Sequence, residues 1–520
     1  MRNLLFLLFI ISAISLTSCR NDFEFEPSQG GLEFSKDTVY LDTVFTNIGS
    51  STYTLKVYNR SNKNISIPSI RLGKGLDSKY RMTVDGIVGN NRIFENVEML
   101  AKDSMYIFIE VTADVAAANP TDFLYTDQIL FGNGTTEQKV ELVTLIQDAY
   151  FLYPQRFDDG TYENINIGDS PVRGFLLDEN DPINGNEYIW NNTKPYVIYG
   201  YAAVPANKTL VVEAGARIHF HAESVLIIGD QGSIKVNGEI SNNPDNPLQN
   251  HVIFQGDRLE PLYEDVPGQW GAIWLTQGSK NNEFTNCIIK NGIVGLLIDG
   301  NTGLSNPEAD VKLKNVQIYD HSNYGILARN AYMKGENVVI NSAGQIALAC
   351  SYGGKYNFNH STFNNNWASS KQVSVFLNNF IEGADPEILP LEEATFTNCI
   401  IYGSNQLQML INKKDHPTFN YKFDHCLIKF NNINNVYSDN PLYQFATDTT
   451  HYVNCIIATN NSVANPRFLN IVKNKLNIGD DSAAKGQANA LFSIFPDILN
   501  NPRNPPLDMG AYNSTVFEED

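Results

Sequence analysis

The side chains best suited to acid–base chemistry gather around Asp320-His321. Lys290 precedes this pair and Arg329 follows it, so the group offers a carboxylate, an imidazole and two cations. Such groups can remove or deliver a proton during a reaction, provided that the fold brings them together. The alternative is a structural turn, because Ser322-Asn323 comes directly after the pair.

Three other side chains are candidates for binding a ligand. Tyr319, Tyr402 and Lys429 occupy equivalent outward positions of the repeat described below, and they offer two aromatic rings and an ammonium group. Both kinds of group contact sugars. No pair of carboxylates accompanies them at these positions, which argues against hydrolysis by two carboxyl groups.

One segment is rich in oxygen ligands of the kind that Ca²⁺ prefers. Asp178, Asn180 and Asp181 lie within ten residues that also contain Glu179 and Glu187. Their spacing is not that of an EF-hand, so a polar linker is the competing interpretation. The six cysteines contain no CxxC pair and have no HxxxH partner, which excludes a zinc motif. We therefore expect no cofactor, unless Ca²⁺ binds at this segment.

Four of the cysteines occur in nearly identical strings, and these strings reveal a repeat. Aligning the chain on them gives seven units with the reference residues Cys287, Val316, Val338, Ser361, Cys399, Cys426 and Cys455. The residue before each reference is Asn or His, and the residue two positions later is Ile or Phe. Alternating apolar residues predict one face of a short strand with buried, structural cysteines, and the Asn/His position predicts a turn.

Repeats of this length stack into a solenoid, because each unit buries its apolar face only against its neighbours. The pattern resembles the right-handed parallel β-helix of the pectate-lyase-like superfamily, in which Asn ladders line a turn. The resemblance covers residues 188–515, including Gly268-Gln269-Trp270-Gly271 and a closing segment that contains Pro506-Leu507-Asp508-Met509-Gly510. Known members include polysaccharide lyases and hydrolases, so the resemblance specifies the architecture better than the activity.

One outward column of the predicted β-helix is largely apolar. It consists of Ile288, Gln317, Val339, Thr362, Ile400, Leu427 and Ile456. Large bare apolar surfaces are uncommon, so we expect the insertion near residues 382–393, a long loop, the N-terminal domain or a partner to cover this column.

A different domain precedes the β-helix. Residues 31–150 contain short alternating strands separated by turn residues, which predicts a β-sandwich of immunoglobulin-like type. The stretch from Tyr53 to Ile67 resembles the modules of abnormal-spindle and hydin-type proteins. Residues 151–187 are expected to form a linker or cap. The predicted fold class is therefore all-β, with an N-terminal β-sandwich followed by a right-handed parallel β-helix.

The first residues indicate export. Residues 1–18 combine Arg2 with an apolar stretch too short to span a bilayer, which is typical of a signal peptide. Leu16-Thr17-Ser18-Cys19 resembles the lipobox of bacterial lipoproteins, which implies that Cys19 carries the lipid. Residues 19–30 form an acidic tether, and its tract Arg20-Asn21-Asp22-Phe23-Glu24-Phe25-Glu26 resembles the surface-export signal of Bacteroidetes-type lipoproteins. The resemblance implies an outer-membrane lipoprotein exposed on the cell surface.

The net charge of −20 argues against nucleic acid as a partner, because phosphate binding needs clustered cations. We expect the protein to be anchored by lipid in the outer membrane and to bind an extracellular polysaccharide or a surface protein, without evident catalysis. A polysaccharide lyase or glycoside hydrolase on the same β-helix is the first alternative. A structural subunit of an envelope assembly is the second.

Overall fold

The computed structural model describes residues 24–88, 92–114, 123–300, 304–369, 371–383, 386–460, 463–492 and 496–517. The predicted signal peptide, residues 1–18, and the predicted lipidation residue Cys19 lie outside these ranges. The chain divides into two compact units between Asp148 and Ala149. No helix in the described ranges is long and apolar enough to cross a membrane.

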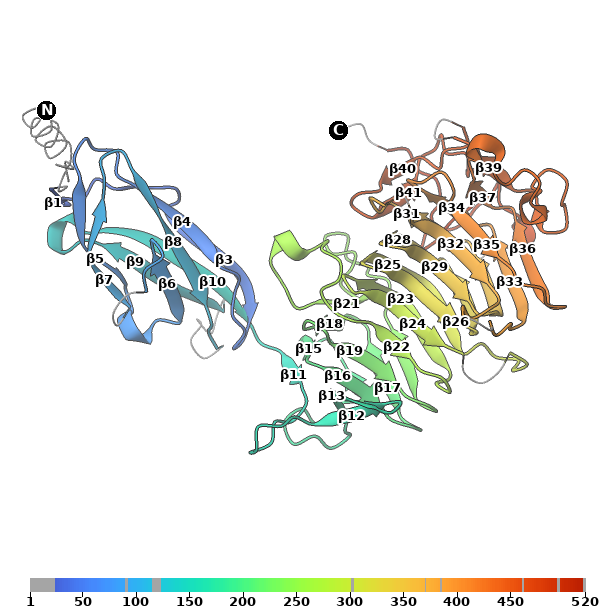
Figure 1. Ribbon diagram of the computed structural model, residues 1–520, viewed down its shortest axis with the longest axis horizontal. Helices are drawn as coiled ribbons and strands as arrows, with labels where there is room; N and C mark the ends of the chain where they lie inside the picture. Colours follow the sequence, from blue (N-terminus) through green and yellow to red (C-terminus); the bar gives the residue numbers. More distant parts are fainter. Residues whose placement is uncertain are drawn as a thin grey trace, which may run out of the picture. The chain divides into compact units, whose positions relative to one another are not determined.

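The first unit is a sandwich of two mainly antiparallel sheets that share one apolar core (Figure 1). The six-stranded sheet holds β1 (Glu26–Pro27), β5 (Ile65–Leu72), β7 (Ile93–Met99), β9 (Leu124–Phe131), β10 (Gln138–Gln147) and β3 (Thr38–Phe45). The four-stranded sheet holds β2 (Glu33–Phe34), β4 (Tyr53–Tyr58), β8 (Ser104–Val111) and β6 (Tyr80–Val84). Strand β8 shows the alternation that a sandwich requires, with Met105, Ile107, Ile109 and Val111 buried.

The second unit is a parallel β-helix, so the predicted all-β fold class is confirmed (Figure 1). Its nineteen-stranded sheet holds β11 (Tyr150–Leu152), β14 (Ile189–Trp190), β15 (Tyr196–Ile198), β17 (Thr209–Glu213), β18 (Arg217–Phe220), β20 (Ser233–Asn237), β21 (Val252–Gly256), β23 (Asn282–Lys290), β25 (Val311–His321), β27 (Tyr332–Glu336), β28 (Val339–Ala343), β30 (Gly354–Asn359), β31 (Thr362–Asn365), β33 (Leu391–Thr397), β34 (Ile400–Gly403), β36 (Phe419–Asp424), β37 (Leu427–Lys429), β38 (Tyr452–Val453) and β39 (Ile456–Ala458).

A ten-stranded sheet forms another side of the β-helix. It holds β12 (Asn164–Ile167), β13 (Ser170–Leu176), β16 (Tyr201–Val204), β19 (Val225–Ile228), β22 (Ile273–Leu275), β24 (Val294–Asp299), β26 (Tyr324–Arg329), β29 (Ile346–Ser351), β32 (Val373–Asn378) and β35 (Met409–Asn412). Strands β40 (Phe468–Asn470) and β41 (Lys475–Ile478) form a separate antiparallel pair. The described helical elements are short 3₁₀ turns: η1 (Gly75–Asp77), η3 (Gly134–Thr136), η4 (Pro261–Tyr263), η5 (Ile433–Asn435), η6 (Pro441–Tyr443) and η7 (Ala490–Phe492).

Strand pairing confirms the repeat that was read from the sequence. Cys287 pairs with Val316 in the next rung, and the pairs Gln317–Val339, Val339–Thr362, Thr362–Ile400, Ile400–Leu427 and Leu427–Ile456 continue the same register. Three residues before the reference position, Phe358, Phe396, Phe423 and Tyr452 stack inside the β-helix with ring centroids 5.0–5.7 Å apart. The five described cysteines are free thiols, and Cys455 is the one that is not fully buried.

The Asn/His column forms a bend between two rows of strands. Its members all have left-handed backbone, with φ between 44° and 56°: Asn286, Asn315, Asn337, His360, Asn398, His425 and Asn454. Asn tolerates this conformation better than most residues. The Asn315 Nδ2 donates to Asn286 Oδ1 over 2.9 Å, and Asn337 Nδ2 donates to Asn315 Oδ1 over 2.9 Å. The column therefore satisfies its own amides from rung to rung.

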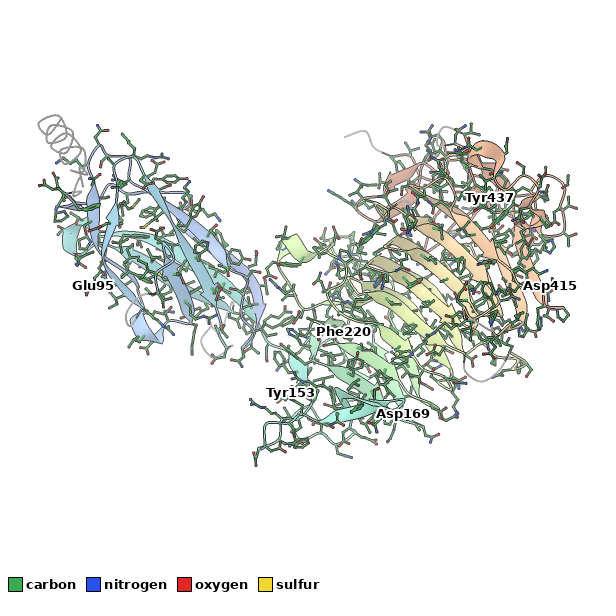
Figure 2. The ribbon with its side chains drawn as sticks, in the orientation of Figure 1. Glu95, Tyr153, Asp169, Phe220, Asp415 and Tyr437 are labelled. Carbon is green, nitrogen blue, oxygen red and sulfur yellow. The ribbon has the colours of Figure 1, made fainter. Side chains whose placement is uncertain are left out.

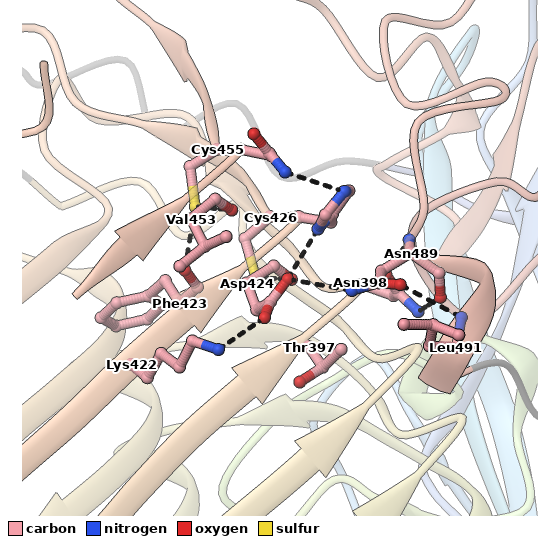
Figure 3. Close-up of polar contacts among 12 residues, drawn as sticks. Thr397, Asn398, Lys422, Phe423, Asp424, Cys426, Val453, Cys455, Asn489 and Leu491 are labelled. Atoms are coloured by element: carbon pink, nitrogen blue, oxygen red, sulfur yellow. Dashed lines mark hydrogen bonds and ion pairs between the residues drawn. The ribbon is translucent and has the colours of Figure 1, made fainter. Parts of the chain in front are cut away.

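The histidines of this column join the same network. Asn398 Nδ2 lies 3.0 Å from His360 Nε2, and Asn454 Nδ2 lies 3.3 Å from His425 Nε2. Figure 3 shows Asp424 next to this column, where it accepts bonds from Lys422 Nζ (2.7 Å) and Asn489 Nδ2 (3.4 Å). Burial lowers the pKa of His360 to about 3, so its ring is neutral at physiological pH.

The C-terminal segment covers the apolar outer column. Leu476, Ile498, Ala511 and Tyr512 pack against Ile288 and Val339, and Ile478, Ala484 and Met509 pack against Ile400 and Leu427. The sequence left open whether a loop, another domain or a partner covers this column. In the described residues, a long and mostly irregular C-terminal segment covers it. Arg503 anchors it, because its buried guanidinium donates to Asn337 Oδ1 and to the Gly510 and Ala511 carbonyls.

Replacing Asn315 with Ala is expected to lower the free energy of unfolding of the β-helix by about 2–4 kcal/mol. Ala is strained in the left-handed backbone conformation of this position, and the change removes two buried hydrogen bonds of the side-chain amide. Asn315→Gly keeps the backbone freedom and should lose about 1 kcal/mol less. Trp fluorescence in urea reports this unit alone, since all four Trp lie between residues 190 and 367. Equal losses for Ala and Gly would contradict the role assigned to the left-handed turn.

Leu476→Ala is expected to destabilise the β-helix by about 2–5 kcal/mol, as in an interior core, because Leu476 is fully buried under the cover. Leu491→Ala is the control: Leu491 lies in the same segment but is 89% exposed, so its loss should stay within about 0.5 kcal/mol. Urea unfolding followed by Trp fluorescence measures both. A small effect at Leu476 would mean that the C-terminal segment is only loosely attached.

Candidate functional site

A pocket of about 640 Å³ opens between the outer face of the β-helix and the C-terminal segment. Strands β31, β34 and β37 form one wall, and the segment around β40 forms the other. The residues that line it are Asn364, Asn366, Tyr402, Gly403, Ser404, Lys429, Asn465, Arg467, Phe468, Leu469, Asn470 and Ile471. Its lining contains amides, two hydroxyls, two cations and apolar side chains, but no carboxylate.

Tyr402 and Lys429 lie side by side on adjacent rungs, as their strands β34 and β37 pair in register. Lys429 is 1% exposed, and its Nζ lies 5.1 Å from the centre of the Tyr402 ring. This Nζ donates to the carbonyl oxygens of Gly403 (2.6 Å) and Ser404 (3.4 Å). Two of the three ligand-binding residues predicted from the sequence therefore meet in this pocket.

Both side chains are buried without a full set of partners. No carboxylate in the described parts of the chain lies within ion-pair distance of Lys429, and burial lowers the pKa of its ammonium. Among the residues that the structure describes, none is a hydrogen-bond partner of the Tyr402 hydroxyl, and burial raises its pKa, so it stays protonated. Buried polar groups are normally satisfied, so this hydroxyl, beside an ammonium that uses two of its three hydrogen-bond donors on carbonyl oxygens, is an unusual feature of the pocket wall.

Asn364 is oriented by a chain of hydrogen bonds that starts at Asp320. The Asp320 carboxylate accepts from Asn474 Nδ2, Asn474 Oδ1 accepts from Asn341 Nδ2, and Asn341 Oδ1 accepts from Asn364 Nδ2, each over 2.7 Å. In its ionised form the Asp320 carboxylate can only accept, and it then sets the direction of every amide in this chain. Asn364 is left with its Oδ1, a hydrogen-bond acceptor, available at the wall of the pocket.

Asp320 itself lies under the C-terminal segment and is 7% exposed. Burial, reinforced by the charge of Asp265, raises the pKa of its carboxyl group to about 7. Asp320 thus orients groups at the pocket through Asn474 and Asn341 and is not part of the pocket lining.

The opposite wall comes from residues that sequence reasoning did not select as site residues. Arg467 pairs with Asp481 over 3.1 Å, and the Phe468 ring lies edge-on to Tyr402 with centroids 6.3 Å apart. Asn465-Pro466-Arg467-Phe468 was visible as part of the closing segment. Nothing in its composition indicates which rung it covers, because that pairing arises only when the segment folds back.

The four residues predicted as an acid–base cluster do not converge. His321 points into the β-helix, where it is fully buried and its Nε2 lies 3.2 Å from the Ile289 carbonyl oxygen. Lys290 and Asp320 are on the outer face, and Lys290 Nζ lies 3.3 Å from the Glu264 carbonyl oxygen. Arg329 belongs to the ten-stranded sheet, where it pairs with Asp299 over 2.5 Å. The alternation of a strand separates His321 from Asp320.

Tyr319, the third predicted ligand-binding residue, is buried under the cover. Its hydroxyl donates to Gln317 Oε1 over 2.7 Å, and it packs with Tyr512 in the cluster that holds the C-terminal segment. Burial and its contact with Tyr512 raise its pKa well above the usual range. Tyr319 therefore stabilises the cover and does not reach the pocket.

The predicted Ca²⁺ segment forms a turn that uses its carboxylates internally. Asp178 Oδ1 accepts from the backbone N–H of Asn180, and Asp181 Oδ1 accepts from those of Ile183 and Asn184. Glu187 Oε2 accepts from the Asp178 N–H. Within the described ranges, no group of three or more His, Cys, Asp or Glu side chains is arranged to hold a metal ion.

Comparison with protein-family models gives no match for this chain, and comparison with curated proteins gives none either.

The stability of the β-helix should fall as the pH drops from 6.5 toward 4. Burial lowers the pKa of His321 to about 4, so below pH 6.5 the unfolded chain binds a proton that the folded chain does not. The stability that neutral His321 contributes is complete above pH 6.5, and at most on the order of 3 kcal/mol is lost by pH 4. His219, with a pKa lowered by burial to about 4, acts in the same direction.

His321→Gln should flatten this pH dependence, measured as urea-unfolding free energies at several pH values by Trp fluorescence. Ile289→Val is the control, because it weakens packing in the same place without removing a titrating group and should leave the slope unchanged. An unchanged slope in His321→Gln would contradict the burial of a neutral imidazole.

Proposed function

We propose that the protein is a lipid-anchored lipoprotein of the outer membrane, exposed at the cell surface, whose β-helix binds an extracellular glycan in the Tyr402–Lys429 pocket. The observation that carries the proposal is the pair of buried, incompletely bonded polar groups in the pocket wall, the Tyr402 hydroxyl and the Lys429 ammonium. Anchoring at Cys19 is supported by the lipobox-like residues Leu16 to Cys19. The immunoglobulin-like unit would serve as the spacer.

The lining suits a sugar better than a flat apolar ligand. Donors come from Tyr402, Lys429 and Arg467, and Asn364 offers its Oδ1 as an acceptor, so hydroxyl groups of a sugar could both donate and accept. Phe468 and Ile471 provide apolar surface for the C–H faces of a ring. A few fixed polar groups on an otherwise apolar wall are typical of small-ligand sites.

A polysaccharide lyase is the second candidate, and the lowered pKa of Lys429 favours it. A lysine whose pKa burial lowers is more often neutral near pH 7, and only the neutral amine can remove the proton next to a uronate carboxyl group. A hydrolase is less well supported, because the pocket lining contains neither Asp nor Glu and hydrolases of this kind use two carboxyl groups.

Binding to a panel of neutral and acidic polysaccharides tests the proposal. Lys429→Met should weaken binding at least about 10-fold. Tyr402→Phe should weaken it about 5–10-fold, which corresponds to the free energy of one hydrogen bond. Tyr402→Phe should keep or raise the melting temperature, since it removes an unsatisfied buried hydroxyl. Tyr319→Phe is the matched control: its hydroxyl is bonded under the cover, so it should lose stability and keep binding.

The same experiment separates binding from catalysis when unsaturated-sugar absorbance and new reducing ends are recorded. Unsaturated products from a uronate polymer, lost in Lys429→Arg, would replace the binding proposal with the lyase, because Arg keeps the charge but cannot accept the proton. If no polysaccharide binds the full chain, the glycan proposal fails and a role in an envelope assembly takes its place.

A further inference from the structure

A column of apolar side chains runs along the outer face of the ten-stranded sheet. Strands β22, β24, β26, β29, β32 and β35 lie side by side in this sheet (Figure 1), and each contributes one outward residue to the column. Strand pairing places these residues in register from one strand to the next. We name the column the Trp274–Leu410 stripe, and its members in order are Trp274, Leu297, Leu327, Ala349, Phe376 and Leu410.

The stripe points away from the core and keeps partial exposure. In β24, Leu297 is half-buried, whereas Leu296 and Ile298 on either side of it are fully buried in the core. The outward residues of β22, β26, β32 and β35 are half-buried in the same way. The apolar column on the nineteen-stranded sheet differs, because Val339 and Ile400 are fully buried beneath the C-terminal segment. Within the described ranges, therefore, no segment seals the Trp274–Leu410 stripe.

A second apolar column widens this face. Val294 pairs with Tyr324, Tyr324 with Ile346, and Ile346 with Val373, and the first three of these are half-buried. Parallel strands that are apolar on both faces normally belong to sheets that are covered on both faces. The outer face of this sheet therefore has the composition of a covered surface, like the outer face that the C-terminal segment covers.

The face carries no net charge, although the chain has 57 acidic and 37 basic residues. From β16 to β35, the strands of this sheet contain two charged residues, Asp299 and Arg329, which pair with each other over 2.5 Å. Figure 2 labels the exposed Asp169 and Asp415, which lie in the loops after β12 and β35, where the charges resume. A neutral face does not repel a second copy of an acidic chain, and it lacks the cations that an anionic lipid surface would need.

The face is large enough for contact between two copies. Six strands about 4.8 Å apart and about 20 Å long give roughly 500 Å² on each copy. Two such faces would bury about 1,000 Å² in total, which is the size at which specific interfaces begin.

The Trp274–Leu410 stripe is also complementary to itself. When two stripes run antiparallel about a twofold axis between β26 and β29, the small Ala349 of one copy faces Leu327 of the other. In the same arrangement Leu297 faces Phe376, and Trp274 faces Leu410. Each contact occurs twice, as in every twofold interface, so one stripe of modest length supplies six apolar contacts.

We propose that this face joins two copies of the chain in a symmetric dimer, with their Trp274–Leu410 stripes packed antiparallel. The two sheets pack face to face, with the paired Asp299 and Arg329 at the edge of the contact. The dimer uses neither Tyr402 nor Lys429, so it does not depend on the function proposed for their pocket.

Sedimentation velocity of the full chain at micromolar concentration tests the proposal. The wild-type chain should sediment as a dimer. Leu327→Glu should weaken the dimer at least about 100-fold, because each copy would bury an unpaired carboxylate near the axis. Leu491→Glu is the matched control: it adds the same charge at a leucine that is 89% exposed on the C-terminal segment, so the dimer should persist.

Cross-linking tests the orientation without relying on a destabilising charge. Leu297 and Phe376 lie three strands apart, about 14 Å, which is too far for a disulfide within one chain. The antiparallel arrangement places them opposite each other in two copies. Oxidation of L297C/F376C by oxygen with copper phenanthroline should therefore give a covalent dimer on a non-reducing gel, whereas L297C alone should stay monomeric on that gel.

Three results would overturn the proposal. The first is a wild-type chain that sediments as a monomer, and the second is a dimer that persists unchanged in a folded Leu327→Glu variant. The third is a failure of L297C/F376C to cross-link while the chain is dimeric, which would exclude the antiparallel arrangement. If a monomeric wild-type chain binds phosphatidylcholine vesicles and Leu327→Glu does not, the stripe contacts a lipid surface and the dimer is wrong.

Discussion

The β-helix depends on the side-chain hydrogen bonds that link successive members of the Asn/His column. Each member turns the chain in the left-handed conformation, and Asn315 both donates to the rung before it and accepts from the rung after it. A turn repeated at one position fixes the strand register, because a slip of one residue would point every side chain to the wrong face. The interior stack of Phe358, Phe396 and Phe423 follows from that register.

The same column also holds the cover in place. Asn337 accepts from the buried Arg503, and Asn398 Nδ2 donates to the Asn489 carbonyl oxygen, so the C-terminal segment is attached to the ladder itself. This attachment lets the outer face remain as apolar as an interior, with Val339, Ile400 and Leu427 fully buried. Without the C-terminal segment the solenoid would expose an apolar stripe. With it, this sheet packs against an apolar core on both of its faces.

In the described parts of the chain, the buried Lys429 of the Tyr402–Lys429 pocket has no acidic partner, in a protein whose net charge is −20. Lys429 is buried where the cover meets the outer face. Its ammonium donates to two carbonyl oxygens beside the Tyr402 ring, and this incomplete set of partners in a partly aromatic wall supports the ligand proposed there.

The sequence by itself determined the repeat, the turn column and the inward and outward positions, because alternation and stacking are local rules that act on each rung alike. It also indicated that Tyr402 and Lys429 share an outward column. It did not determine that His321 points inward while Tyr319 and Asp320 lie on the outer face, because the left-handed backbone of Asp320 itself shifts the alternation at that point. Tertiary structure alone decided that Phe468 and Arg467 close the pocket, and that Tyr319 lies under the cover, since contacts between distant segments follow from packing.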